Sequence, residues 1–230
     1  LFVASTPTAY MTDGVKNGWI EPISKANLPV LNSGKFPKQF YNGETVVVQV
    51  TPWGISYDSE KLKGDDIPKT WSDILNPKFN GQVITGDPRT GGVYASFWKM
   101  IIDAYGESFL TKLHDMNPRL ASGGVPAIQS LAAGEGVINA PTISALVLSV
   151  TNKGAKVGYV VPDITTGVEI FVVLTARDKS KHPNAARLMA NYVLSEDGNK
   201  VVNADPGNIY LYDPTGLPKK YQTPDDSGGM

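Results

Sequence analysis

The stretch Ile84-Thr85-Gly86-Asp87-Pro88-Arg89-Thr90-Gly91-Gly92 joins a short apolar strand to a helix. The strand, 82–85, is apolar on nearly consecutive positions, as is typical of a strand covered on both faces. In the helix, 92–104, apolar side chains recur every three or four residues, which is the spacing of a helix with one buried face. A strand, a glycine-rich loop and a helix in this order indicate an α/β sheet.

The same order recurs along the chain, where short strands rich in Val and Ile alternate with longer helical stretches. The predicted strands are 1–4, 45–50, 82–85, 136–139, 156–161 and 168–175. The predicted helices are 92–104, 106–116, one opened by Pro126, 142–152 and one that begins at 182–184. This alternation predicts an α/β architecture with largely parallel sheets. The proline-rich region 51–81 has little periodicity, so we expect it to cross between two bodies and not to form a core.

The composition excludes several classes of function. The chain has 230 residues, with 21 basic and 22 acidic side chains, a net charge of -1 and no cysteine. A chain with 41% hydrophobic and 19% charged residues is globular. Balanced charge gives no general attraction to nucleic acid, so no nucleic-acid partner is expected. The absence of cysteine excludes disulfides, thiolate metal sites and cysteine nucleophiles.

Catalytic motifs are missing from the sequence. It contains no Gly-x-Ser-x-Gly elbow, no phosphate loop ending in Gly-Lys-Ser/Thr and no His-Glu-x-x-His. His114 and His182 lie apart, without a second histidine nearby to complete a metal site. We therefore predict a non-catalytic protein without cofactor or metal. The alternative is a transferase or hydrolase, which would need a nucleophile–base pair that no motif supplies.

Four loops that join a strand to a helix are candidate ligand sites. A helix N-terminus exposes unpaired N–H groups and a partial positive charge, so it can bind an anion without net positive charge nearby. Parallel strands gather such loops at one edge of a sheet. The candidate residues in these loops are Ser5, Thr6, Arg89, Thr90, Gly91, Ser122, Gly123, Gly124, Asn139 and Thr142. For any single loop, ordinary capping and turn chemistry is the competing interpretation.

Two of the candidate side chains have specific alternatives. Arg89 can contact an anion or form an ion pair with Asp87, two residues before it. Trp53 can stack on a ligand or pack at a hinge, and the sequence favours neither role.

Three further stretches carry a family resemblance. They are 53–83, which contains Trp53-Gly54-Ile55-Ser56-Tyr57 and Ile67-Pro68-Lys69-Thr70-Trp71, then Ala133-Gly134-Glu135-Gly136, and the late pair Lys181-His182-Pro183-Asn184 and Leu194-Ser195-Glu196-Asp197-Gly198. The chain resembles, from Leu1 to about Leu217, the extracellular solute-binding proteins of ABC importers. The branch it resembles contains ferric-iron binders and their relatives for phosphorylated sugars and phosphonates.

The resemblance implies a type II periplasmic binding protein with two α/β lobes joined by hinge strands. Lobe one would contain 1–50 and 163–205, and lobe two 51–162 and 206–230. Family members carry a further strand–helix–strand before the equivalent of Leu1, so the N-terminal part of lobe one is expected to be missing here. The protein would be a monomer that captures a small-molecule ligand and delivers it to an ABC transporter permease. It would be periplasmic with its signal peptide removed, or extracellular and membrane-anchored in a Gram-positive host.

The resemblance also bears on the ligand. Ferric-iron binders of this branch carry adjacent tyrosines where this chain has Ala140-Pro141-Thr142. We therefore expect a small organic or phosphorylated anion, with ferric iron and a synergistic anion as the alternative. In related anion binders the loops that match Ser122-Gly123-Gly124 and Asn139 hold the anion. Glu169 would face the cleft and accept a hydroxyl or amine, or it would be an exposed carboxylate at a strand start.

Overall fold

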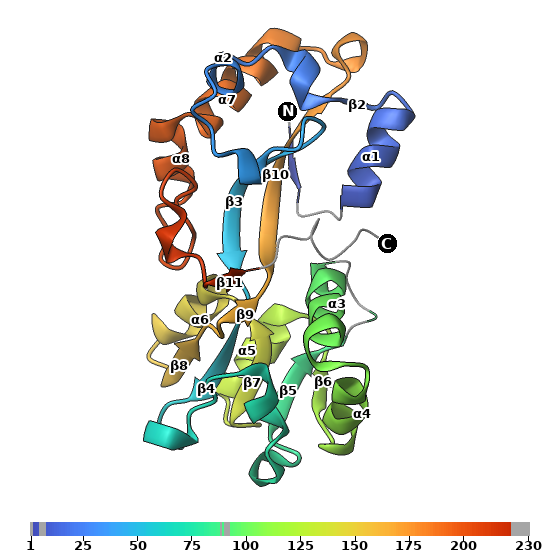
Figure 1. Cartoon of the computed structure of the whole chain (residues 1–230). Coiled ribbons are helices and arrows are strands. Elements are labelled where there is room, and N and C mark those ends of the chain that lie inside the picture. Colours follow the sequence, from blue (N-terminus) through green and yellow to red (C-terminus); the bar gives the residue numbers. More distant parts are fainter. Residues whose placement is uncertain (1, 5–7, 88, 90–92, 222–230) are drawn as a thin grey trace. The chain divides into compact units, whose positions relative to one another are not determined.

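The computed structural model describes residues 2–4, 8–87, 89 and 93–221 (Figure 1). These residues form two compact units. Unit 1 contains the chain up to Thr51 together with Val168–Leu217, and unit 2 contains Pro52–Gly167 and the described residues Pro218–Tyr221. The chain therefore passes from one unit to the other after Thr51, after Gly167 and after Leu217.

In the described chain, this division differs from the predicted lobes at three places. Residues 163–167 belong to unit 2, 206–217 belong to unit 1, and Thr51 also belongs to unit 1. The second difference has a clear cause, because the Ile209 N–H donates to the Val50 carbonyl at 2.9 Å. The Leu211 N–H likewise donates to Asn199 Oδ1 at 3.0 Å.

Unit 1 is built around strand β10 (Gly167–Thr175), the longest strand of its four-stranded sheet. Strand β10 is antiparallel to β1 (Phe2–Ala4) and β2 (Ile20–Glu21), and it also pairs with β3 (Val46–Pro52). The prediction of largely parallel sheets is therefore wrong for β1, β2 and β10. The reason is that β10 returns from unit 2 and runs against strands of the opening segment.

The helices of unit 1 are α1 (Thr8–Lys16), α2 (Pro29–Asn32), α7 (Pro183–Leu194) and α8 (Glu196–Val202). Helix α8 lies beside β3 in Figure 1. Two buried asparagines join them, since the side-chain nitrogens of Asn199 and Asn203 donate to the Val48 carbonyl at 2.9 and 3.0 Å.

Unit 2 contains a five-stranded sheet in the order β6-β5-β7-β4-β8. Its strands are β4 (Gly54–Asp58), β5 (Val83–Gly86), β6 (Arg119–Ala121), β7 (Ile138–Thr142) and β8 (Val157–Val160). Strand β5 is parallel to β6 and β7, as predicted, whereas β4 is antiparallel to β7 and β8.

Strand β4 corrects the expectation that region 51–81 contributes no core element. It lies between β7 and β8, and its first residues, 54–56, are buried. Trp71 is also fully buried, and its ring N–H donates to the Ile164 carbonyl at 2.7 Å. A glycine and the neighbouring prolines hide the strand from a periodicity search.

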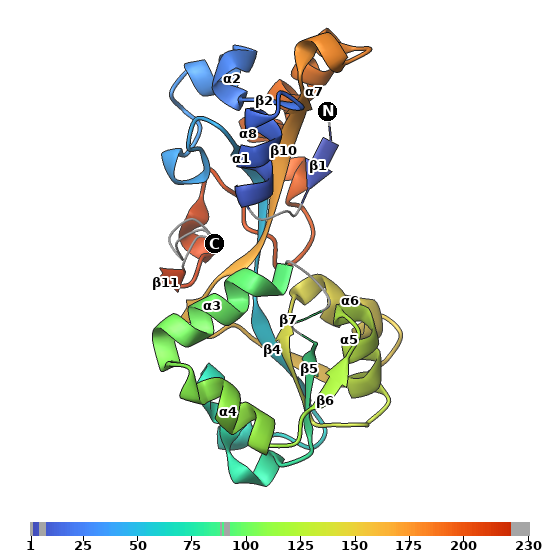
Figure 2. The ribbon, with the colours of Figure 1, turned by 90° about the vertical axis from the view of Figure 1, so that its right-hand side faces the viewer.

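Helices cover both faces of this sheet (Figure 2). Helices α3 (Val93–Tyr105) and α4 (Ser108–Asp115) lie on one face, and α5 (Gly124–Ala132) and α6 (Ser144–Thr151) lie on the other. Ile84 of β5 and Ala121 of β6 belong to the hydrophobic core formed with α5 and α6, so these two strands anchor the two helices.

The remaining elements are two short strands and the 3-10 helices. Strands β9 (Ile164–Thr165) and β11 (Lys220–Tyr221) form a parallel pair. The 3-10 helices are Ile23–Ala26, Lys38–Phe40, Gly64–Asp66, Trp71–Leu75, Pro77–Phe79, Arg177–Lys179 and Pro214–Gly216. Within the described ranges, no helix has the length and apolar character needed to span a membrane.

Candidate functional site

The predicted loops of unit 2 meet at one edge of its sheet. Because β5, β6 and β7 are parallel, their carboxyl ends Gly86, Ala121 and Thr142 lie at the same edge. Gly54, the first residue of the antiparallel strand β4, is paired with Thr142, so Trp53 lies at this edge too. We call this region the carboxyl edge. In open α/β sheets, ligands bind outside the carboxyl ends of the strands.

The start of α5 offers hydrogen-bond donors at the carboxyl edge. The described backbone hydrogen bonds use none of the N–H groups of Gly123, Gly124 and Val125, and Pro126 has no N–H. The first N–H of this turn with a partner is that of Ala127, which donates to the Gly123 carbonyl at 3.1 Å. Unpaired N–H groups and the partial positive charge of a helix N-terminus favour an anion.

The two glycines of this loop differ in their surroundings. A Cβ atom on Gly123 would meet no atom within 4 Å, so the space beside Gly123 is open. A Cβ on Gly124 would lie 2.6 Å from Leu146 Cδ1, which indicates close packing of α5 against α6. Ser122 is exposed. Of the predicted loop residues, Ser122 and Gly123 therefore have room for a ligand, whereas Gly124 has a packing role.

Several polar side chains near this edge are buried without a partner. Asn139 in β7 is 0% exposed, and neither its side-chain nitrogen nor its oxygen forms a hydrogen bond to a described residue. The Thr142 hydroxyl, also 0% exposed, has no hydrogen-bond partner in the described part of the chain. A buried polar group without a partner costs about 1–3 kcal/mol, so two at one edge need an explanation such as a bound polar ligand.

Asn139 lies on the same face of the sheet as α5. It is in register with Ile84 on the parallel neighbour β5, and side chains in register on adjacent strands point to the same face. Ile84 packs against α5 and α6. The unpartnered amide of Asn139 therefore faces the helix whose N-terminal N–H groups are also unpaired.

Sequence reasoning missed two further residues of this kind, Thr85 and Ser144. Thr85 in β5 is 2% exposed and Ser144 at the start of α6 is 8% exposed, and the hydroxyl of each lacks a hydrogen-bond partner among the described residues. A signal for Thr85 did exist, because it is the one hydroxyl residue in the apolar run Val83-Ile84-Thr85.

Trp53 is packed in the interior of unit 2. Its ring stacks on Tyr94 with 5.4 Å between centroids and an interplanar angle of 23°, and Phe97 meets its edge at 6.2 Å. Only 3% of Trp53 is exposed. Of the two roles open to Trp53 from the sequence, its ring geometry corresponds to packing.

Arg89 forms an ion pair with Asp87, which is the alternative that its spacing suggested. Arg89 donates from Nε and a terminal nitrogen to the two carboxylate oxygens at 2.8 and 2.6 Å. These hydrogen bonds, followed by that of the Arg89 backbone N–H, lower the pKa of Asp87 to about 2. The guanidinium is thus already paired with a carboxylate.

Comparison with known proteins identifies the family. Residues 7–210 match the model of the family described as bacterial extracellular solute-binding protein. The chain belongs to this family. The family consists of solute-binding proteins and not of enzymes, in agreement with the missing catalytic motifs.

Solved structures show that this solute-binding protein has the type II periplasmic binding protein fold. It is similar to a substrate-binding protein of an ABC transporter from Agrobacterium tumefaciens, with a TM-score of 0.76 and 13% identity over 96% of this chain and 70% of that one. The structure of iron-bound HitA from Pseudomonas aeruginosa also has a TM-score of 0.76, with 16% identity over 98% of this chain and 77% of that one. The structure of fructose-6-phosphate-bound AfuA from Actinobacillus pleuropneumoniae has a TM-score of 0.68, with 16% identity over 95% of this chain and 69% of that one.

A curated relative is longer than this solute-binding protein. It is an uncharacterised protein of Haemophilus influenzae, 25% identical over 186 residues, or 79% of this chain. The match spans 51% of that relative, about half its length.

The description of the carboxyl edge does not cover all the predicted ligand-binding residues of this solute-binding protein. Ser5, Thr6, Thr90 and Gly91 fall outside the described residues. Glu169 belongs to β10 in unit 1 and is 7% exposed, so the alternative of an exposed carboxylate at a strand start is wrong. No group of three or more His, Asp or Glu suited to a metal ion occurs in the described ranges.

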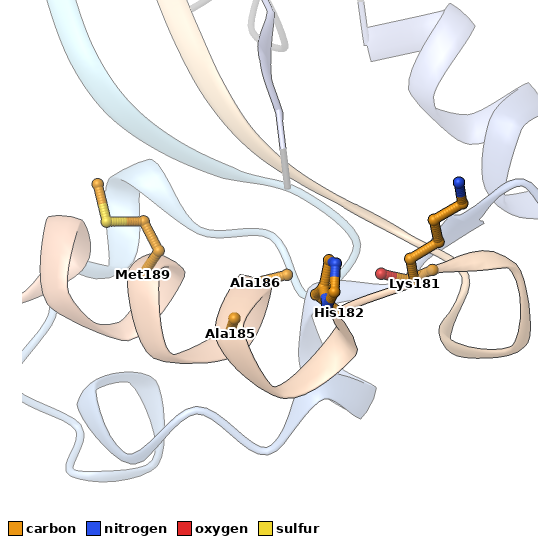
Figure 3. Close-up of a pocket in the computed structure, with 6 residues that line it drawn as sticks. Lys181, His182, Ala185, Ala186 and Met189 are labelled. Carbon is orange, nitrogen blue, oxygen red and sulfur yellow. The ribbon is translucent and has the colours of Figure 1, made fainter.

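Unit 1 also carries a shallow hollow of about 340 Å³ at the start of α7 (Figure 3). It is lined by Ser180, Lys181, His182, Ala185, Ala186 and Met189. Lys181 and His182 stand at the helix start and are exposed. None of the predicted site residues is among those that line this hollow.

Proposed function

We propose that this solute-binding protein captures a small organic or phosphorylated anion in the periplasm or at the outer cell surface and delivers it to an ABC importer. The observation that carries the proposal is the start of α5, where three N–H groups without a partner in the described backbone lie beside the open space at Gly123. The buried, unpartnered side chains of Asn139 and Thr142 belong to the neighbouring strand β7. Capture would end in closure of the two lobes, and the permease would recognise the closed form.

The charge distribution supports binding by dipoles. Arg89 is paired with Asp87, and the chain as a whole has a net charge of -1. An anion at this edge would therefore be held by backbone N–H groups and hydroxyls, which need no surplus of basic side chains. The fructose-6-phosphate in AfuA shows that a protein with this fold accepts a phosphorylated ligand.

Ferric iron is the alternative, favoured by the similarity to iron-bound HitA. Against it, β7 ends in Ala140-Pro141-Thr142, which offers no phenolate. In unit 1, the Tyr212 hydroxyl is engaged as a donor to the Leu194 carbonyl at 2.6 Å. A charge-transfer absorption band after addition of Fe(III) would support iron binding, and a spectrum without such a band would reject it.

Calorimetric titration of the purified protein with phosphorylated sugars, phosphonates and dicarboxylates tests the proposal. Replacing Ser122, the exposed hydroxyl before α5, by alanine should weaken binding of the best anion about tenfold, because a hydrogen bond to a charged group is lost. Ser130→Ala, in the last part of the same helix, is the matched control and should leave affinity unchanged. Equal affinities of the two variants would show that the Ser122 hydroxyl does not contact the anion, and a wild-type protein that binds none of these anions would contradict the proposal.

A further inference from the structure

Tyr94 contacts three parts of the carboxyl edge, although no sequence motif predicted that it belongs to the site. It is the second residue of α3, and only 6% of it is exposed. Its ring lies over the indole of Trp53, which precedes β4. The two stacked rings therefore form an apolar surface at the carboxyl edge.

The phenolic end of Tyr94 extends over the end of β5 to the start of α5. A Cβ atom on Gly86, the last residue of β5, would lie 2.9 Å from Tyr94 Cζ and 3.0 Å from its hydroxyl oxygen. A Cβ on Gly124, the first residue of α5, would lie 3.4 Å from the same oxygen. The hydroxyl thus lies beside the turn whose N–H groups are unpaired.

The Tyr94 hydroxyl is available as a hydrogen-bond donor. Among the described residues, none forms a hydrogen bond with it. Burial raises the pKa of Tyr94 above its ordinary value, so the phenol stays protonated at neutral pH.

The directions of the donors favour one class of head group. Tyr94 comes from α3, whereas the unpaired N–H groups belong to α5 on the opposite face of the sheet (Figure 2). A tetrahedral oxyanion has acceptor oxygens in several directions and can accept from both sides. The acceptor sites of a carboxylate all lie near one plane, so it offers fewer directions to donors that approach from two faces of a sheet.

We infer that the Tyr94 hydroxyl donates directly to the bound anion and makes the site selective for a phosphate or phosphonate group over a carboxylate. The inference rests on the proposed anion site at α5. Tyr94 would supply the donor from the α3 side, and its ring would hold the head group away from Trp53.

Calorimetry with fructose 6-phosphate, methylphosphonate and succinate tests the inference on the whole protein. Tyr94→Phe removes one oxygen and keeps the ring stacked on Trp53. It should weaken binding of the tighter phosphoryl probe about tenfold and change succinate binding less than about twofold. Tyr105→Phe removes a hydroxyl at the other end of the same helix and should leave all affinities within about twofold.

A second variant moves the tyrosine and keeps its hydroxyl. Gly86→Ala places a methyl group against Tyr94 Cζ, so the ring must shift, and binding of the phosphoryl probe should again weaken. Thermal unfolding without ligand confirms that each variant is folded.

The outcomes separate this inference from the function on which it rests. Unchanged affinity for phosphoryl probes in both Tyr94→Phe and Gly86→Ala overturns the role of Tyr94 and leaves anion capture standing. Binding of succinate alone by the wild-type protein overturns the phosphoryl selectivity only. If the wild-type protein binds none of the probes, anion capture and the role of Tyr94 both fail.

Discussion

Two asparagines are fully buried, and they differ in their hydrogen bonding. Asn199 donates to the Val48 carbonyl and accepts from the Leu211 N–H at 3.0 Å, so its amide is satisfied. Asn139 has no partner for either amide atom among the described residues. Burial with partners stabilises a fold, whereas burial without them lowers stability and needs a reason, such as a bound ligand or water.

The two asparagines therefore predict opposite results for the same substitution. Asn139→Leu should leave the free energy of unfolding unchanged or raise it, because an unsatisfied amide is replaced by an apolar side chain of similar size. It should also weaken binding of the anion about tenfold. Asn199→Leu should cost about 1–3 kcal/mol of stability, because the Leu211 N–H loses its buried acceptor while the Val48 carbonyl keeps only the donor from Asn203.

Urea unfolding and calorimetry of both variants check this pair. Marked destabilisation by Asn139→Leu, comparable to that of Asn199→Leu, would mean that Asn139 serves the fold and not a ligand.

At the scale of elements, strands with clear composition were predictable and the exceptions have physical causes. The predicted strands 82–85 and 168–175 correspond to β5 and β10, which bury their apolar runs Val83-Ile84 and Phe171-Val172-Val173-Leu174. Strand β4 was missed because Gly54 and the polar Ser56 interrupt its apolar character. The role of Gly124 was also out of reach, since only the structure places Leu146 against it.

The loop after β5 carries a prediction about charge. Because Asp87 pairs with Arg89, Asp87→Asn should release the guanidinium and strengthen anion binding up to about fivefold, as expected for an exposed charge. The gain should shrink in high salt. Asp115→Asn, an exposed carboxylate at the end of α4, is the control and should have no effect.

A change of pH near neutrality should not reproduce this gain in anion affinity in the wild-type protein. The pKa of Asp87 is lowered to about 2, so any contribution of the ion pair is present above the ordinary carboxylate range and is lost only as the pH falls through about 2. Calorimetry of Asp87→Asn at two salt concentrations measures the effect. Weaker binding in this variant would show that Asp87, and not Arg89, contacts the ligand.

For the whole molecule, the sequence predicted two α/β bodies but misplaced where the chain divides between them. Residues 206–217 lie with unit 1 because the Ile209 N–H bonds to the Val50 carbonyl, which is distant in sequence, and the Leu211 N–H bonds to the Asn199 side chain. Neither bond leaves a local pattern in the sequence. The anion loops were predictable because strand, glycine and helix follow one another locally, whereas Tyr94 joins the edge only through contacts with Gly86 and Gly124.

The last prediction concerns the participation of both units in capture. If both lobes close on the ligand, hydrogen exchange with a saturating phosphoryl probe should slow in the first turn of α5 and also at the start of β10, where Glu169 is buried. Binding to unit 2 alone would slow exchange only within Pro52–Gly167. Ser122→Ala at the same probe concentration is the control, and its weaker binding should reduce protection in both places together, since a ligand stabilises the segments it contacts in proportion to its occupancy. Protection confined to unit 2 would contradict two-lobe capture and leave the anion site at α5 intact.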